Sequence, residues 1–138
     1  MSAAYVDGME HRKLMTFRHM IVLATLAISA MPAMAHPKLL SASPAANTAA
    51  AKTGTVRLVF NQRLAPATST ATLVMTGMPG MANHPDMKMP VSTAIAADGK
   101  TIVMTSAKPL PTGTYRVDWT VVGADSHRIA GKHAFSIR

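Results

Sequence analysis

Apolar and polar residues alternate along several short stretches of the chain, and no stretch keeps a helical period. The clearest example is 115–121, where Tyr115, Val117, Trp119 and Val121 fall on one face of an extended segment and polar residues fall on the other. Residues 56–60 repeat this alternation. By the same criterion, further strands are predicted at 38–43, 71–75, 91–96, 101–105 and 132–137.

Turn-forming residues separate these strands. The pair Asp98-Gly99 lies between two β-prone segments and predicts a tight hairpin, and the proline-containing segment 109–113 predicts a longer turn. The alanine-rich segment 45–51 is too short for a stable helix and is predicted to be a loop. About seven short strands in roughly 100 residues indicate an all-β domain, a β-sandwich or Greek-key barrel.

The core of this domain is expected to form around Trp119. Phe60 and Phe135 lie on other predicted strands and are expected to pack around it. His133 shares strand parity with Phe135 and Ile137, so we expect a structural role for His133 and do not count it among the candidate ligands.

The first 35 residues have a different character. Residues 1–19 are polar and carry three basic side chains, residues 20–30 are almost wholly apolar, and Ala33-Met34-Ala35 offers small residues at the two positions that signal peptidase reads. The apolar stretch is well short of the roughly 20 residues that a membrane-spanning helix needs. We therefore predict a secretory signal peptide at 1–35 and one domain at 36–138, whose first residue is His36.

Charge and cysteine content restrict the chemistry of the exported domain. Residues 36–138 contain eleven lysine and arginine residues against four aspartates, a net charge of +7, but the basic residues are scattered and no basic run alternates with aromatics. This pattern argues against nucleic-acid binding. The chain has no cysteine, so a metal ion would have to be held by imidazole, carboxylate, amine or thioether groups.

The first candidate site combines His36 with Asp125 and His127. After cleavage, the free α-amine and the imidazole of His36 can chelate one metal ion together, and Pro37 has no N–H that would add an amide ligand. Asp125 and His127 are two residues apart, and in extended backbone this spacing places both side chains on one face. Three nitrogens and one carboxylate oxygen form a ligand set that suits Cu(II).

The second candidate site is the methionine-rich segment 75–89. It holds five of the six methionines of residues 36–138. Methionine usually fills gaps in a core, but the glycines and prolines of this segment exclude a helix and its methionines do not keep one strand parity. We therefore predict a surface loop.

Thioethers are soft ligands that prefer Cu(I), and one imidazole is available beside them. The candidate Cu(I) ligands are Met75, Met78, Met81, His84, Met87 and Met89. A flexible hydrophobic contact surface is the alternative explanation for this segment.

Several motifs together resemble the CopC family of periplasmic copper-resistance proteins. They cover the whole exported domain and read HPKLLSASPA, FNQRL, LVMTGMPGM, GTYRVDWTVVGADSH and GKHAFSIR. The resemblance implies a cupredoxin-like or immunoglobulin-like fold with a Cu(II) site at one end and, in some members, a Cu(I) site in a methionine-rich loop at the other. It places the Cu(II) ligands at His36, Asp125 and His127, and the Cu(I) loop at Met75, Met78, Met81, His84 and Met87.

The chain departs from the family pattern at two places. Gln62 stands where relatives can carry an acidic residue, so a carboxylate that would assist the Cu(II) site is missing. The methionine-rich loop is longer by a residue or two, which leaves open whether Met87 or Met89 is its last thioether ligand.

These observations predict a periplasmic copper carrier or buffer that has no catalytic turnover. Its expected partners are copper ions and, for delivery, an inner-membrane copper transporter or other periplasmic copper proteins, so that the protein meets the membrane only through a partner. Because the amine and the imidazoles must lose protons to bind metal, Cu(II) affinity is expected to fall on acidification.

Two other classes of function compete with the carrier. An N-terminal histidine with a second histidine also resembles the copper brace of a small monooxygenase, but the domain has few aromatic residues for a sugar-binding face. An immunoglobulin-like adhesion or assembly module is the third class, and it would bind no metal.

Overall fold

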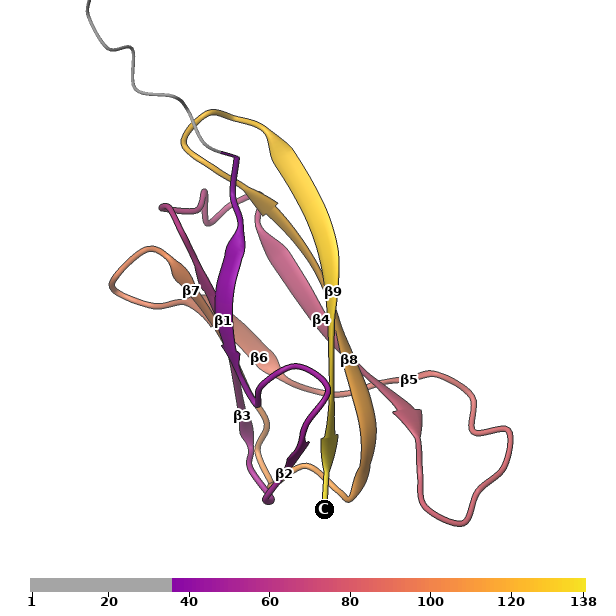
Figure 1. Cartoon of the computed structure of the whole chain (residues 1–138). Coiled ribbons are helices and arrows are strands. Elements are labelled where there is room, and N and C mark those ends of the chain that lie inside the picture. Colours follow the sequence, from indigo (N-terminus) through magenta and orange to yellow (C-terminus); the bar gives the residue numbers. More distant parts are fainter. Residues whose placement is uncertain (1–35) are drawn as a thin grey trace, which may run out of the picture. The chain divides into compact units, whose positions relative to one another are not determined.

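The computed structural model describes residues 36–138, so the predicted signal peptide at 1–35 lies outside the described residues. The described part is built of strands and turns in two sheets that pack face to face (Figure 1). Within it, no helix is long and apolar enough to cross a lipid bilayer.

The first sheet has four strands in the order β1-β3-β7-β6. Their bounds are β1 (Leu39–Ser43), β3 (Thr55–Phe60), β7 (Thr101–Thr105) and β6 (Ser92–Ile95). The second sheet has five strands in the order β2-β9-β8-β4-β5. Their bounds are β2 (Ala49–Ala50), β9 (Arg128–Ile137), β8 (Gly113–Val122), β4 (Thr70–Gly77) and β5 (Met87–Lys88).

The predicted all-β sandwich is confirmed, and the seven longer strands are those that alternation predicts. The two-residue strands β2 and β5 were not predicted, because two residues are too few for alternation to show. β2 falls inside the segment 45–51 that was predicted to be a loop. There it pairs in parallel with the end of β9, Ala49 opposite Ser136 and Ala50 opposite Ile137.

The core forms around the predicted aromatic residues. Trp119 meets Phe60 edge to face at a centroid distance of 5.1 Å, and its ring lies against Gly131, where a Cβ atom would come within 2.2 Å of it. Tyr115 stacks on Phe135 and is fully buried, and its hydroxyl donates a hydrogen bond to the carbonyl of Pro111. The glycine therefore makes room for the largest side chain of the core.

His133 has the structural role that its strand parity predicts. It is only 5% exposed, and its Nε2 atom lies 2.8 Å from the carbonyl oxygen of Pro44. The ring also lies beside Phe135 in the core. This contact ties β9 to the segment that follows β1.

The long strand β8 separates the two candidate sites. Its last residue, Val122, opens the turn that carries Asp125, whereas Thr114, near its start, pairs with Gly77 at the point where the methionine-rich segment leaves β4. The two segments thus lie at opposite ends of β8 (Figure 1). At about 3.3 Å per strand residue, the separation is roughly 30 Å.

Candidate metal centre

The turn between β8 and β9 brings Asp125 and His127 together. The N–H of Ser126 donates to the carbonyl of Gly123, the N–H of Gly123 donates to the carbonyl of His127, and Ser126 adopts a left-handed conformation with φ of 63°. The extended backbone predicted for this spacing is therefore wrong. A closed turn, and not strand parity, places the two side chains beside each other.

His36 reaches the same turn from the start of β1. The next residue, Pro37, is buried, and its ring packs where a side chain at Gly123 would lie, 2.8 Å from an ideal Cβ position. The side-chain amide nitrogen of Gln62 lies 2.7 Å from the same position. The absence of a side chain at Gly123 therefore allows the N-terminal segment to approach the turn.

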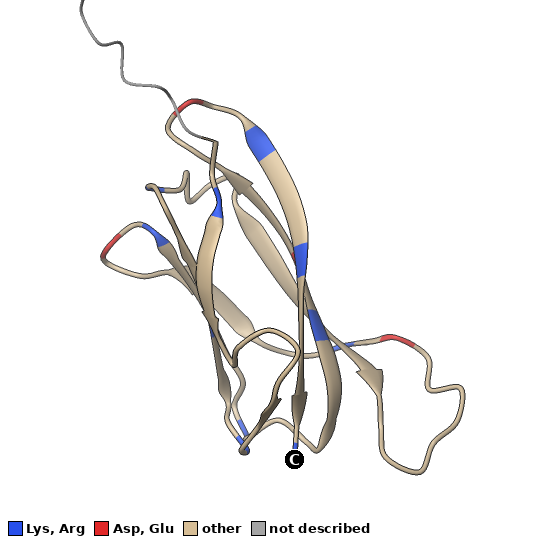
Figure 2. Cartoon of the chain, viewed as in Figure 1, with Lys and Arg blue, Asp and Glu red and all other residues tan. Residues whose placement is uncertain are grey.

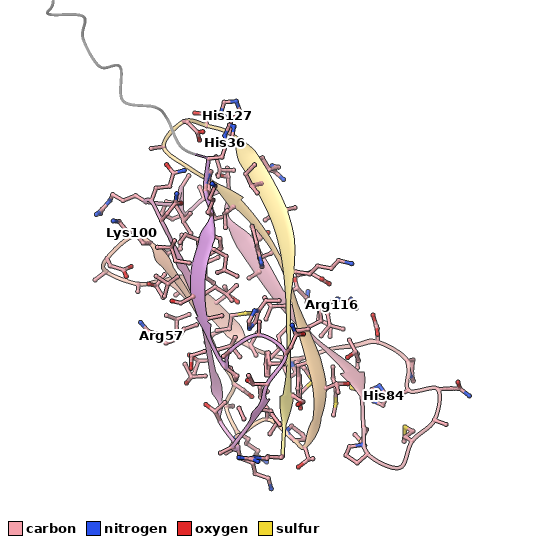
Figure 3. All side chains as sticks on the ribbon, in the orientation of Figure 1. His36, Arg57, His84, Lys100, Arg116 and His127 are labelled. Carbon is pink, nitrogen blue, oxygen red and sulfur yellow. The ribbon has the colours of Figure 1, made fainter. Side chains whose placement is uncertain are left out.

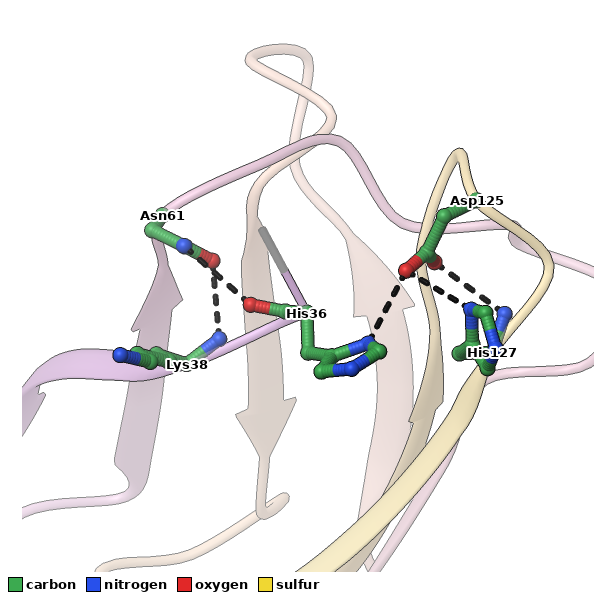
Figure 4. A network of polar contacts seen from close by, with 5 residues as sticks. All are labelled: His36, Lys38, Asn61, Asp125 and His127. Carbon is green, nitrogen blue, oxygen red and sulfur yellow. Dashed lines mark hydrogen bonds and ion pairs between the residues drawn. The ribbon is translucent and has the colours of Figure 1, made fainter. Parts of the chain in front are cut away.

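Asn61 holds this segment, a role that was not predicted from the sequence. Its side-chain oxygen accepts a hydrogen bond of 2.8 Å from the N–H of Lys38, and its amide nitrogen donates to the carbonyl of His36 at 3.4 Å (Figure 4). Its backbone N–H also donates to the carbonyl of Lys38. Asn61 has none of the imidazole, carboxylate, amine or thioether groups that indicate a copper ligand, and its only signal in the sequence is its place in the FNQRL motif.

The three predicted ligand residues converge on one carboxylate oxygen. The Nδ1 atoms of His36 and His127 lie 3.1 and 3.0 Å from the same oxygen of Asp125, Oδ2 (Figure 4). The two imidazole rings are 4.8 Å apart between centroids. One potential ligand atom from each of the three residues lies within 4.8 Å of the others.

Burial and charge differ sharply between the three side chains. The side chain of Asp125 is 2% exposed, whereas those of His36 and His127 are 58% and 64% exposed. Burial by itself would raise the pKa of Asp125, but hydrogen bonds from the backbone N–H and ring of His127 and from the ring of His36 outweigh it and hold the pKa below its usual value. The centre thus presents an ionised carboxylate beneath two accessible imidazoles, a donor set that suits a cation of borderline softness.

The structure divides the methionine-rich segment between core and surface. Met75 is part of β4 and only 2% exposed, so the surface-loop position predicted for it is wrong: the strand continues to Gly77 and turns this side chain into the core. Met89 is half-buried and packs against the core. Met78, Met81 and Met87 are 38%, 53% and 49% exposed.

A tight turn pairs two of the exposed methionines. The N–H of Met81 donates to the carbonyl of Met78 at 3.2 Å, and Gly80 has a φ of 78°, as the third residue of a type II turn requires. Met78 and Met81 also form an isolated antiparallel bridge. Directly opposed residues of such a bridge carry their side chains on the same face, so the two thioethers project together.

His84 lies in the same segment, and its ring is half-buried. Its Nδ1 atom is buried and has no hydrogen-bond partner within residues 36–138. A buried ring nitrogen without a partner is costly. A metal ion held with the neighbouring thioethers would supply that partner.

An ion-pair network fastens the returning arm of the segment to the sheet. Arg116 on β8 donates to Asp86 at 3.0 Å and to both oxygens of Asp118, at 2.8 and 3.1 Å. Hydrogen bonds to Asp118 and then to Asp86 raise the pKa of Arg116. Figure 3 shows His84 and Arg116 far from His36 and His127, which lie together at the other end.

Comparison with known proteins identifies close relatives. The family model of the CopC domain matches residues 39–138. Copper resistance protein C of Xanthomonas campestris pv. juglandis is 42% identical over 118 residues, covering 86% of this chain and 92% of the relative. Copper resistance protein C of Escherichia coli is 43% identical over 109 residues, covering 79% and 86%.

A solved structure is similar as well. The crystal structure of PcoC, a methionine-rich copper resistance protein from Escherichia coli, has 40% sequence identity to the chain and a TM-score of 0.69. The match covers 75% of this chain and 100% of the PcoC chain.

Proposed function

The chain belongs to the CopC family of copper-resistance proteins, and on that premise we propose that it is a periplasmic copper carrier with separate sites for Cu(II) and Cu(I). The observation that carries the proposal is the convergence of His36 and His127 on the buried carboxylate of Asp125. These residues come from distant parts of the chain. Their meeting around one ionised oxygen is what a cation site requires.

The Cu(II) site needs a free amine at His36. When the signal peptide is removed after Ala35, the terminal amine and the imidazole of His36 form one chelate, and His127 and Asp125 complete an N₃O set. The contacts of Pro37 and Asn61 support this site, because they hold the terminal residue over the turn before any metal arrives. Such preorganisation lowers the entropy cost of binding.

The Cu(I) site is proposed at the solvent-facing donors of the methionine-rich segment, namely Met78, Met81, His84 and Met87. Met75 lies directly opposite Met87 in the register of β4 and β5, but its side chain is buried in the core. Met89 packs on the core, which favours Met87 as the last thioether ligand. Replacing Met75 with leucine should therefore lower Cu(I) affinity less than replacing Met78 or Met81.

A carrier explains these features better than a copper-dependent monooxygenase does. Within residues 36–138 the aromatic side chains are all buried and build no exposed platform for a polysaccharide. The relatives are named for copper resistance. Peroxide-driven oxidation of a polysaccharide or a reporter phenol by the copper-loaded protein would favour the enzyme instead.

The decisive experiment compares protein that begins at His36 with protein that keeps Ala35 in front of it. Competition titration should show that the extended form binds Cu(II) at least about 100-fold more weakly, because the terminal amine is lost from the chelate. His36→Ala should have a similar effect.

The Cu(I) affinity of the same proteins is the internal control and should stay unchanged. His84→Ala should give the reverse result, with Cu(I) affinity lowered and Cu(II) affinity preserved. If the extended form or His36→Ala held Cu(II) as tightly as the starting protein, the proposed site would be wrong.

A further inference from the structure

The outer face of the five-stranded sheet has a hollow beside the methionine-rich segment. Its floor is one row of register neighbours across three strands, Gly77 on β4, Thr114 on β8 and Ser136 on β9. Met78 and Pro79 form one wall. The volume is about 320 Å³, at the lower limit of ligand pockets and suited to one or two side chains.

The hollow exists because its floor is made of small residues. A Cβ atom at Gly77 would lie 2.6 Å from the hydroxyl of Thr114, so a larger residue there would displace this side chain. The hydroxyls of the floor have partners within the protein, since Thr114 bonds to Thr76 and Ser136 donates to the carbonyl of Thr48. The surface that remains open is therefore mainly apolar.

Three basic side chains lie at the same end of the molecule. The N–H of Arg138 donates to the carbonyl of Ala50, and the N–H of Leu110 donates to the carbonyl of Thr53. These bonds bring together the three chain segments that carry Lys52, Lys108 and Arg138. All three side chains are exposed. Arg138 directly follows Ile137, which lines the hollow.

No acidic residue of the described part balances these charges. Asp86 is paired with Arg116, Asp98 lies in the β6–β7 turn, Asp118 lies in the middle of β8, and Asp125 belongs to the metal centre. Figure 2 shows the same distribution, with blue segments and no red around the end marked C. This end is therefore a positive surface next to an apolar hollow.

The location of the hollow beside the proposed Cu(I) site indicates what this surface binds. Met78 is both a wall of the hollow and a proposed Cu(I) ligand. Transfer of Cu(I) between proteins requires a soft donor of the acceptor to approach the ion while the old ligands leave. A segment of the acceptor protein that is bound in the hollow lies close enough to Met78 to supply this donor.

We propose that this end of the five-stranded sheet docks an acidic, methionine-bearing segment of a copper-accepting protein. One apolar side chain enters the hollow, carboxylates face Lys52, Lys108 and Arg138, and a thioether meets the ion beside Met78. The inference rests on the proposed Cu(I) function. It adds which surface of the sheet binds the partner and which side chains the partner segment carries. A small apolar anchor with a charged border is typical of a weak, fast interface in which charge mainly accelerates association.

The test uses two synthetic peptides of equal length with the same two methionines, one rich in aspartate and the other with lysine at those positions. Cu(I)-loaded protein is mixed with each peptide, and the rate of copper transfer is measured by stopped-flow. The acidic peptide should receive copper about tenfold faster at low ionic strength, and the difference should shrink near 0.15 M salt, a value at which the Debye length is about 8 Å.

A charge-reversed protein locates the surface. The double variant Lys52→Glu/Arg138→Glu should slow transfer to the acidic peptide about tenfold and accelerate transfer to the basic peptide. The matched control Arg57→Glu/Lys100→Glu makes the same change in net charge on exposed residues of the four-stranded sheet and its β6–β7 turn. It should slow transfer far less. Equal effects of the two variants would overturn the proposal, because net charge alone would then explain the rates.

Amide chemical shifts separate this inference from the copper chemistry. Titration of copper-free protein with the acidic peptide should perturb Gly77, Thr114 and Ser136 more than residues of the metal centre. Shifts confined to other surfaces would contradict the docking site even if Cu(I) binds as proposed. If the peptide perturbed these three residues as expected but the protein had no affinity for Cu(I), the proposed function would be contradicted. The surface would then be a binding site of another kind.

Discussion

At the scale of single residues, Asn61 fixes the backbone on both sides of Pro37 without touching a metal ligand atom. It therefore controls where the imidazole and amine of His36 stand. Asn61→Ala removes both side-chain bonds and frees the terminal segment. We expect Cu(II) affinity to fall about tenfold, the usual range for a residue that orients a ligand, in a competition titration.

The Cu(I) affinity of the same variant is its control, because Asn61 lies at the other end of β8 from the methionine-rich segment. A folded Asn61→Ala protein with undiminished Cu(II) affinity would show that Pro37 alone is enough to position the terminus.

The sequence allowed the ligand types to be predicted better than their surroundings. His36, Asp125 and His127 have recognisable donor groups, and the structure brings them together. The burial of Asp125 and the function of Asn61 depend on contacts between distant segments, which no local pattern encodes. Met75 was predicted to lie in the surface loop because the residues that follow it have the composition of a loop. Its strand, however, continues to Gly77.

At the scale of elements, the methionine-rich segment is anchored at both ends. It leaves β4 at Gly77 and returns through Asp86, which Arg116 binds, before β5 pairs with β4. Asp86→Asn keeps the shape of the side chain and removes the ion pair. Because Asp86 is half-exposed, we expect only a twofold to fivefold loss of Cu(I) affinity, about 0.5–1 kcal/mol, measured by competition with a Cu(I) chelator.

The loss should grow at low salt, where the ion pair is stronger. Asp98→Asn is the matched control, since Asp98 lies in the β6–β7 turn away from the segment. An equal change of Cu(I) affinity in both variants would argue that Arg116 does not position the loop.

Element boundaries show what alternation can and cannot predict. The strand 101–105 was predicted with the bounds that β7 has, and Ile102 and Met104, which share one face of it, are both buried. β9 begins four residues before the predicted start at 132, since the small residues Ala130 and Gly131 interrupt the alternation of large apolar and polar side chains. β5 depends on pairing with β4 and has no pattern of its own.

At the scale of the whole molecule, the two proposed sites lie at opposite ends of the sandwich and use chemically different ligands. The amine and imidazole ligands of the Cu(II) site must lose protons before they bind a metal ion, whereas thioethers have no proton to lose. The pKa of Asp125 is lowered, so its carboxylate stays ionised between pH 8 and about 5 and does not cause the loss. We therefore expect acidification over this range to release Cu(II) while Cu(I) is largely retained.

Titrating each ion at several pH values measures this difference. Cu(II) affinity should decline steeply, and Cu(I) affinity only as far as His84 contributes. Parallel declines for the two ions would mean that they share nitrogen ligands, contrary to the assignment of separate sites.

The sandwich as a whole was predictable, but its strand order was not. Alternation tells which face of each strand is buried and says nothing about which strands are neighbours. The parallel pairing of β2 with β9 and the order β1-β3-β7-β6 arise from long-range contacts.

The edge strands of the two sheets affect how concentrated this protein can become without aggregating. Each edge strand is short or irregular: β2 and β5 have two residues, β6 has four, and β1 shifts register between Leu39 and Ser41. Edges of this kind are poor templates for another chain and discourage aggregation. The carrier proposed here would have a capacity set by its own abundance, so edges that resist aggregation would let it accumulate to a high concentration.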